Sequence, residues 1–68
     1  MNGYETLLHF LNKKITILVK CNGEMERVSG KLQGFDEHMN VLLCSKSSTV
    51  LYLTKHIIEY ILPRENHS

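Results

Sequence analysis

Tryptophan is absent from this sequence, proline occurs once, and only two of the 68 residues are cysteines. Two cysteines are too few for the disulfide framework of a small secreted domain. Both stand in apolar, strand-like runs, so we expect Cys21 and Cys44 to be buried, reduced thiols rather than a disulfide or a metal pair. No repeat, linker or low-complexity segment divides the chain, which predicts a single domain over residues 1–68.

Net charge is also nearly absent, because 8 lysines and arginines stand against 7 aspartates and glutamates, for a formal charge of +1. No overall positive field indicates a nucleic-acid-binding protein, so any such function must reside in a local site. The apolar runs are too short to span a bilayer, and no lipidation or targeting motif occurs. We therefore expect a cytoplasmic protein, or a nuclear one in a eukaryote, with no membrane partner.

The residue combinations of common catalytic sites are missing as well. The sequence offers no Ser-His-Asp, Cys-His or paired-carboxylate arrangement, and Asp36 is its only aspartate. The four histidines lack the spacing of a zinc site. We therefore expect no enzyme, no metal or other cofactor and no small-molecule substrate.

What the chain does contain begins with a short helical pattern. Asn2 and Glu5 have the spacing of a capping box, which predicts a helix over about residues 3–12. Four apolar residues recur at helical spacing and should face one open end or face of a barrel: Tyr4, Leu7, Leu8 and Leu11.

Short β-type segments fill the rest of the sequence. Asn22-Gly23 is a strong hairpin signal, because both residues tolerate the positive φ of a type I′ turn. Two glycines four apart, Gly30 and Gly34, favour a sharp bend in a long strand. The predicted fold is therefore mostly β, a helix followed by a strongly bent five-stranded antiparallel open barrel of the small SH3-like kind. We expect strands at about residues 14–21, 24–35, 40–44, 49–53 and 57–62, and a frayed tail over 64–68.

One stretch of this pattern resembles a known family. The residues from Gly30 to Leu43 read Gly-Lys-Leu-Gln-Gly-Phe-Asp-Glu-His-Met-Asn-Val-Leu-Leu. In residue types and spacing they resemble the first signature motif of the Sm-like (Sm, LSm and bacterial Hfq) RNA-binding proteins. The resemblance implies an N-terminal helix, a five-stranded bent sheet, and rings of six or seven subunits that bind short U-rich single-stranded RNA near a central pore.

Two polar corners carry the candidate site. Residues 36–40 and 54–56 are far apart in sequence but can lie at the same end of such a barrel. Unpaired RNA bases are recognised by stacking on flat side chains and by hydrogen bonds to their edges. His38 offers a flat ring, Asn40 offers donors and an acceptor suited to the uracil edge, and Lys55 offers a charge for phosphate.

The resemblance assigns roles at the same positions. In the Sm and LSm branch, the residue matching His38 stacks on the base, that matching Asn40 bonds the base edge, and that matching Asp36 holds the loop. That branch has Arg-Gly where this chain has Thr54-Lys55, whereas the Hfq branch has Lys-His, as in Lys55-His56. The candidate RNA-binding residues are Asp36, Glu37, His38, Asn40, Lys55 and His56.

Size favours self-association, since a 68-residue domain buries only roughly 60% of its unfolded surface. We expect a ring of identical copies, in which the fourth strand pairs with the fifth strand of the next copy. It would bind U-rich RNA without catalysis in RNA metabolism or riboregulation, like Hfq or an archaeal Sm-like protein. The alternatives are a subunit of a heteroheptameric Sm or LSm ring, and a scaffold ring that has lost RNA binding.

Overall fold

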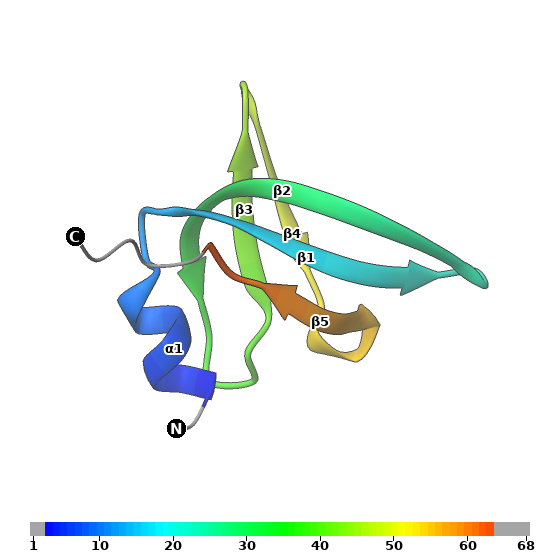
Figure 1. Ribbon diagram of the computed structural model, residues 1–68, viewed down its shortest axis with the longest axis horizontal. Helices are drawn as coiled ribbons and strands as arrows, with labels where there is room; N and C mark the ends of the chain where they lie inside the picture. Colours follow the sequence, from blue (N-terminus) through cyan, green and yellow to red (C-terminus); the bar gives the residue numbers. More distant parts are fainter. Residues whose placement is uncertain (1–2, 64–68) are drawn as a thin grey trace.

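The computed structural model describes residues 3–63, as one short helix followed by a five-stranded antiparallel sheet (Figure 1). The elements are α1 (Gly3–His9), β1 (Lys14–Cys21), β2 (Glu24–Phe35), β3 (Val41–Ser45), β4 (Ser48–Tyr52), the 3-10 turn η1 (Thr54–His56) and β5 (Ile57–Ile61). The sheet order is β4-β3-β2-β1-β5, so the last strand lies beside the first. This confirms the predicted mostly-β fold with an N-terminal helix. Within the described residues no pairing joins β4 to β5, and these strands form the two edges of the sheet.

The core lies on the inner face of this curved sheet. In β1, buried and more exposed residues alternate, as expected for a strand with one face packed inward. Leu7 and Phe10 add the apolar contribution of the N-terminal segment. Eight buried apolar residues make up the core: Leu7, Phe10, Ile15, Ile17, Val19, Leu32, Val41 and Leu43.

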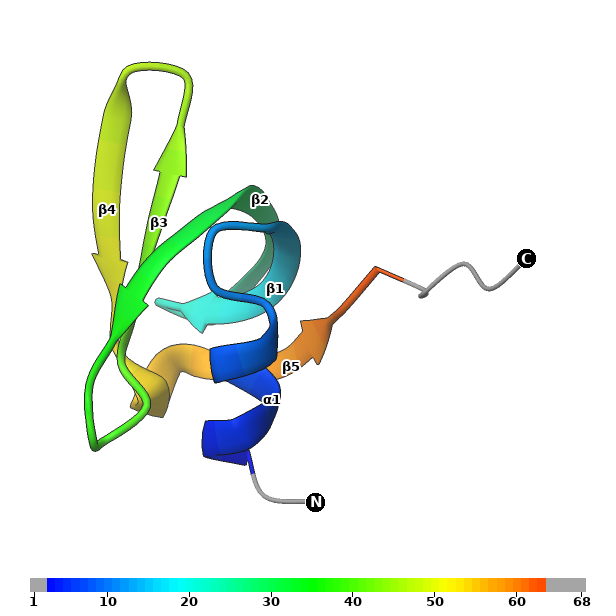
Figure 2. The ribbon, with the colours of Figure 1, turned by 90° about the vertical axis from the view of Figure 1, so that its left-hand side faces the viewer.

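The bend is concentrated in β2, which curves strongly along its 12 residues (Figure 2). At Gly30, a Cβ atom would lie 2.9 Å from the carbonyl oxygen of Cys44, so only glycine lets β3 approach this closely. The pairing register between β2 and β3 then shifts between Leu32 and Gly34, which marks a bulge. Both predicted glycines therefore lie where the strand bends, but they act in different ways.

The two hairpins differ in how closely they follow the sequence prediction. In the β1–β2 turn, Asn22 and Gly23 have φ values of 55° and 81°, the positive values that a type I′ turn requires. The β3–β4 turn is tighter than the predicted four-residue loop, because Ser45 and Ser48 pair and leave two residues between them. Lys46, the first of these, also has a positive φ of 55°.

The helix is shorter than predicted and buries a different face. Its last turn tightens, since the backbone N–H of Leu11 donates to Leu8 O, and Asn12 then adopts a φ of 70° and donates its N–H to Leu32 O. These bonds to the sheet end the helix at His9 rather than near residue 12. Tyr4 and Leu8, predicted to face the barrel, are each 51% exposed, and the unpredicted Phe10 is buried.

The prediction of buried cysteines is wrong. Cys21 is exposed and Cys44 is half-buried, and both thiols are free. Cys21 ends β1 in the part of the β1–β2 hairpin that projects beyond the core (Figure 1), so its apolar neighbours in sequence do not cover it.

Strand bounds agree closely with expectation. β1 and β2 have the predicted bounds. The bounds of β3, β4 and β5 differ from the predicted ones by one residue, at one end or at both. The predicted capping residue Asn2 and the tail 64–68 lie outside the described residues.

Candidate nucleic-acid interface

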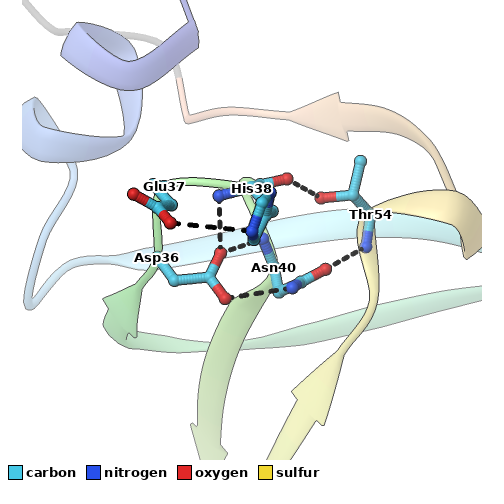
Figure 3. Close-up of polar contacts among 5 residues, drawn as sticks. All are labelled: Asp36, Glu37, His38, Asn40 and Thr54. Atoms are coloured by element: carbon cyan, nitrogen blue, oxygen red, sulfur yellow. Dashed lines mark hydrogen bonds and ion pairs between the residues drawn. The ribbon is translucent and has the colours of Figure 1, made fainter.

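The two polar corners meet, as the sequence predicted. The loop between β2 and β3 and the η1 turn between β4 and β5 are joined by two hydrogen bonds from one residue (Figure 3). The backbone N–H of Thr54 donates to Asn40 Oδ1 at 2.8 Å, and Thr54 Oγ1 donates to the carbonyl oxygen of His38 at 2.6 Å. Segments that are 14 to 16 residues apart in sequence therefore form one surface.

Asp36 holds the β2–β3 loop in shape. Its Oδ1 accepts the backbone N–H groups of His38 and Asn40, at 3.0 and 2.9 Å. Its Oδ2 accepts Asn40 Nδ2 at 3.0 Å. The carboxylate thus takes the place of a backbone acceptor across a loop in which Met39 has a φ of 68°.

The same bonds determine the charge of Asp36. The side-chain hydrogen bond from Asn40, followed by the backbone N–H of Asn40, lowers the pKa of this carboxyl below its ordinary value of 3.8. Desolvation acts in the opposite direction, while the backbone N–H and the positive charge of His38 add to the lowering. Asp36 is therefore an anion at neutral pH.

Asn40 is fixed in orientation by partners on both sides of its amide. Nδ2 donates to Asp36, and Oδ1 accepts from Thr54. A primary amide carries two N–H groups and an oxygen with two lone pairs, so one donor and one acceptor position remain. A flipped amide would place its NH₂ against the N–H of Thr54 and its oxygen against the carboxylate, so the positions of donor and acceptor are set.

His38 and Glu37 project from the tip of the loop. Their side chains are 74% and 86% exposed, and His38 Nε2 lies 3.7 Å from Glu37 Oε2. At this exposure the pair contributes little to stability. The imidazole ring is open to a stacking partner, and it has a carboxylate beside it.

Lys55 and His56 belong to η1, the corner that Thr54 ties to the loop. Lys55 is exposed and His56 is half-buried, and the backbone N–H of His56 donates to Leu53 O at 2.9 Å. The bonds that join η1 to residues 36–40 come from Thr54 rather than from these two side chains. The fold brings Lys55 and His56 to the same end of the sheet through the backbone of the turn.

Residues 5–59 match the family model of the LSM domain, which is most of the chain. The chain belongs to the LSM domain family. Membership supports RNA binding and assembly into rings in general, and the proteins of this family are generally non-catalytic. A search of the curated proteins found no match.

Sequence reasoning missed two residues that build the site of this LSM domain. Thr54 makes both bonds between the corners, although its sequence position marks it only as a departure from Arg-Gly. Tyr60, on β5, is half-buried, and its hydroxyl lies 3.4 Å from the carbonyl oxygen of Met39; desolvation raises the pKa of this phenol. For Thr54, the sequence did offer a signal, namely a hydroxyl residue directly before Lys-His. For Tyr60 it offered none, because the contact of Tyr60 with Met39 depends on the order of the strands in the sheet.

Residues 3–63 of this LSM domain contain neither a metal-binding cluster nor a membrane-spanning helix. No group of three or more histidine, cysteine, aspartate or glutamate side chains there could hold a metal ion. In the same residues, no helix has the length and hydrophobicity needed to cross a membrane.

Proposed function

We propose that this LSM domain binds U-rich single-stranded RNA without catalysis, from the pore of a closed ring of identical copies, in RNA metabolism or riboregulation. One observation carries the proposal. The hydrogen bonds of Asp36 and Thr54 orient the amide of Asn40 and hold the backbone of His38, whose ring is exposed, in the same loop at one end of the sheet (Figure 3). A stacking surface next to an edge reader is what recognition of an unpaired base requires.

The fixed amide explains a preference for uracil. The Watson–Crick edge of uracil presents a carbonyl oxygen beside an N–H, which the free N–H and free lone pair of Asn40 can match. For a base held in one orientation by stacking on His38, adenine presents its donor and acceptor in the reverse order, which the amide could match only after flipping. Because Asp36 and Thr54 oppose the flip, Asn40 discriminates between the two bases.

The other candidate residues have supporting roles. His38 stacks on the base, Lys55 attracts phosphate or a base oxygen, and His56, the next residue of η1, adds a donor. Asp36 acts through the loop that it holds, and Glu37 sets a negative charge at the rim. That charge favours the second candidate function, a scaffold ring without RNA binding, because repeated carboxylates would repel phosphates.

Replacement of Asn40 tests the base-reading role. Asn40→Ala should weaken binding of oligouridylate by about 10-fold or more, since one edge contact is worth about 1–3 kcal/mol, and should change binding of oligoadenylate far less. Fluorescence anisotropy with both labelled strands measures this. The control, Lys55→Ala, should weaken both strands alike and flatten the dependence on salt. Equal loss for the two strands in Asn40→Ala would reject the base reader, and an intact ring that binds neither strand in wild type would leave the scaffold function.

A further inference from the structure

A hollow that is lined in part by lysines lies away from the two corners. An open depression of about 380 Å³ is formed where the start of β1, the middle of β2 and the end of β3 meet. It lies at the Ser45 end of β3, whereas the candidate RNA interface lies at the Val41 end. The residues that line it are Lys14, Ser29, Gly30, Lys31, Cys44, Ser45 and Lys46.

The charge of this depression is of one sign. Three of its seven lining residues are lysines, and none is acidic. Lys14 and Lys31 are direct cross-strand partners, an arrangement in which like charges repel. All three lysines are exposed, and none of them forms an ion pair within residues 3–63. In a chain whose net charge is only +1, this is a local concentration of positive charge.

Neutral donors complete the surroundings. Ser29 and Ser45 contribute hydroxyl groups, and the Ser29 hydroxyl is held by Thr16 Oγ1 at 2.7 Å. Lys46 is positioned by the tight β3–β4 turn, where its φ is 55°. β3 approaches β2 closely beside the depression, since a Cβ atom at Gly30 would lie 2.9 Å from the carbonyl oxygen of Cys44. Ammonium and hydroxyl donors around a small hollow suit a tetrahedral oxyanion.

We propose that this depression binds a phosphate group of the RNA backbone, as a second contact for a strand that extends beyond the base-reading corner; the role of the phosphate as part of RNA rests on the proposed function. A bound phosphate would sit between Lys14 and Lys31 and offset their repulsion. The two ends of β3 are separated by about 13 Å, at roughly 3.3 Å per residue. An RNA strand that only fills the base-reading corner is therefore too short to reach the lysines. The depression lets the protein hold a longer RNA, and it does so without reading the additional bases.

Strand length separates the two sites experimentally. A short oligouridylate should bind equally to wild type and to a triple variant with Lys14→Gln, Lys31→Gln and Lys46→Gln. A long oligouridylate should bind the triple variant more weakly than wild type. The negative slope of log affinity against log salt concentration should become shallower by about 0.7 for each phosphate that the lysines no longer neutralise. Lys20→Gln, an exposed lysine on β1 outside the depression, is the control. An unchanged slope in the triple variant, or an equal loss per lysine in Lys20→Gln, would overturn the site.

A second measurement is independent of the base-reading corner. Titration of the labelled protein with tripolyphosphate, followed by amide NMR, should shift Lys31, Ser45 and Lys46, and these shifts should disappear in Lys31→Gln. If wild type binds no oligouridylate, the proposed function fails, while this titration still decides the anion site. Absence of shifts rejects it, and stronger shifts with a polyglutamate peptide would assign the surface to an acidic protein instead.

Discussion

At the scale of single residues, the site depends on one carboxylate that contacts no ligand in the proposed function. Asp36 accepts three hydrogen bonds within its own loop. Asn40, which Asp36 holds in place, accepts the backbone N–H of Thr54 and so links the loop to η1. The composition of the loop predicted a turn, and the resemblance predicted the role of Asp36 in holding it. The sequence shows a hydroxyl residue before Lys-His, but it does not give the partners of Thr54, because these depend on how β3 brings the ends of β2 and β4 together.

The titration of Asp36 gives a pH prediction. Its pKa is lower in the folded protein than the ordinary value of 3.8, so the carboxylate stabilises the folded loop above that pH. This stabilisation is lost as the pH falls below 3.8 and through the folded-state pKa. The NMR signal of the Asn40 side-chain amide should therefore stay constant from neutral pH down to about 4 and move at lower pH.

The matched variant for this prediction is Asp36→Asn, which cannot titrate. Its Asn40 signal should differ from wild type already at neutral pH, because Nδ2 then faces an amide instead of a carboxylate. It should show no acid transition of its own. An Asn40 signal in wild type that moves between about pH 5 and 7 would contradict the assignment of a lowered pKa.

At the scale of the elements, prediction succeeded where the signal was local. The turn at Asn22-Gly23 requires only that these two residues tolerate a positive φ. The alternation of buried and more exposed residues in β1 requires only that one face of the strand is packed inward. The helix prediction failed because the buried face of the helix is chosen by the sheet. The bond from Asn12 to Leu32 ends α1 early, so Phe10 lies beyond the helix, and Leu7 and Phe10 are buried whereas Leu8 is exposed.

The two bend glycines offer a matched pair of substitutions. Gly30→Ala would bring a Cβ atom to 2.9 Å from the backbone of Cys44, so β3 must move, and we expect a loss of about 1–3 kcal/mol in the free energy of unfolding. Gly34→Ala meets nothing within 4 Å and should be neutral, or more stable by about 0.4–1 kcal/mol. Urea denaturation of both variants at one protein concentration measures the difference. Equal losses would show that the close approach at Gly30 is not what demands glycine.

At the scale of the whole molecule, the sheet presents two edges of different kinds. On β4 and just after it, Val50, Leu51 and Leu53 are 44%, 55% and 38% exposed, and on β5 Ile58 is 50% exposed. Unpaired strands with exposed apolar side chains invite pairing with another chain. This arrangement supports the proposed pairing of β4 with β5 of the next copy, which the sequence predicted from chain length and the five-strand pattern.

Substitution of the edge residues tests assembly. Native mass spectrometry of the wild-type chain should show a defined multiple of 7.9 kDa. Leu51→Lys and Ile58→Lys should each shift the protein toward monomer, since a buried, unpaired charge at an interface is costly. Met25→Lys is the control, because Met25 is 56% exposed but lies on β2, away from both edges. A wild-type protein that is monomeric at micromolar concentration would refute the ring.

Because the two open edges belong to different strands, any number of copies joined in a row still leaves one β4 and one β5 unpaired. When the row closes, the last pairing forms between ends already tethered together, so it gains an interface without the entropy of capturing another molecule. In the proposed ring, closure would make assembly cooperative and partly built rows scarce at equilibrium. Dilution should therefore convert complete rings to monomers over a narrow concentration range. Subunit exchange should also slow sharply once the ring is complete, because each copy is then held by two interfaces.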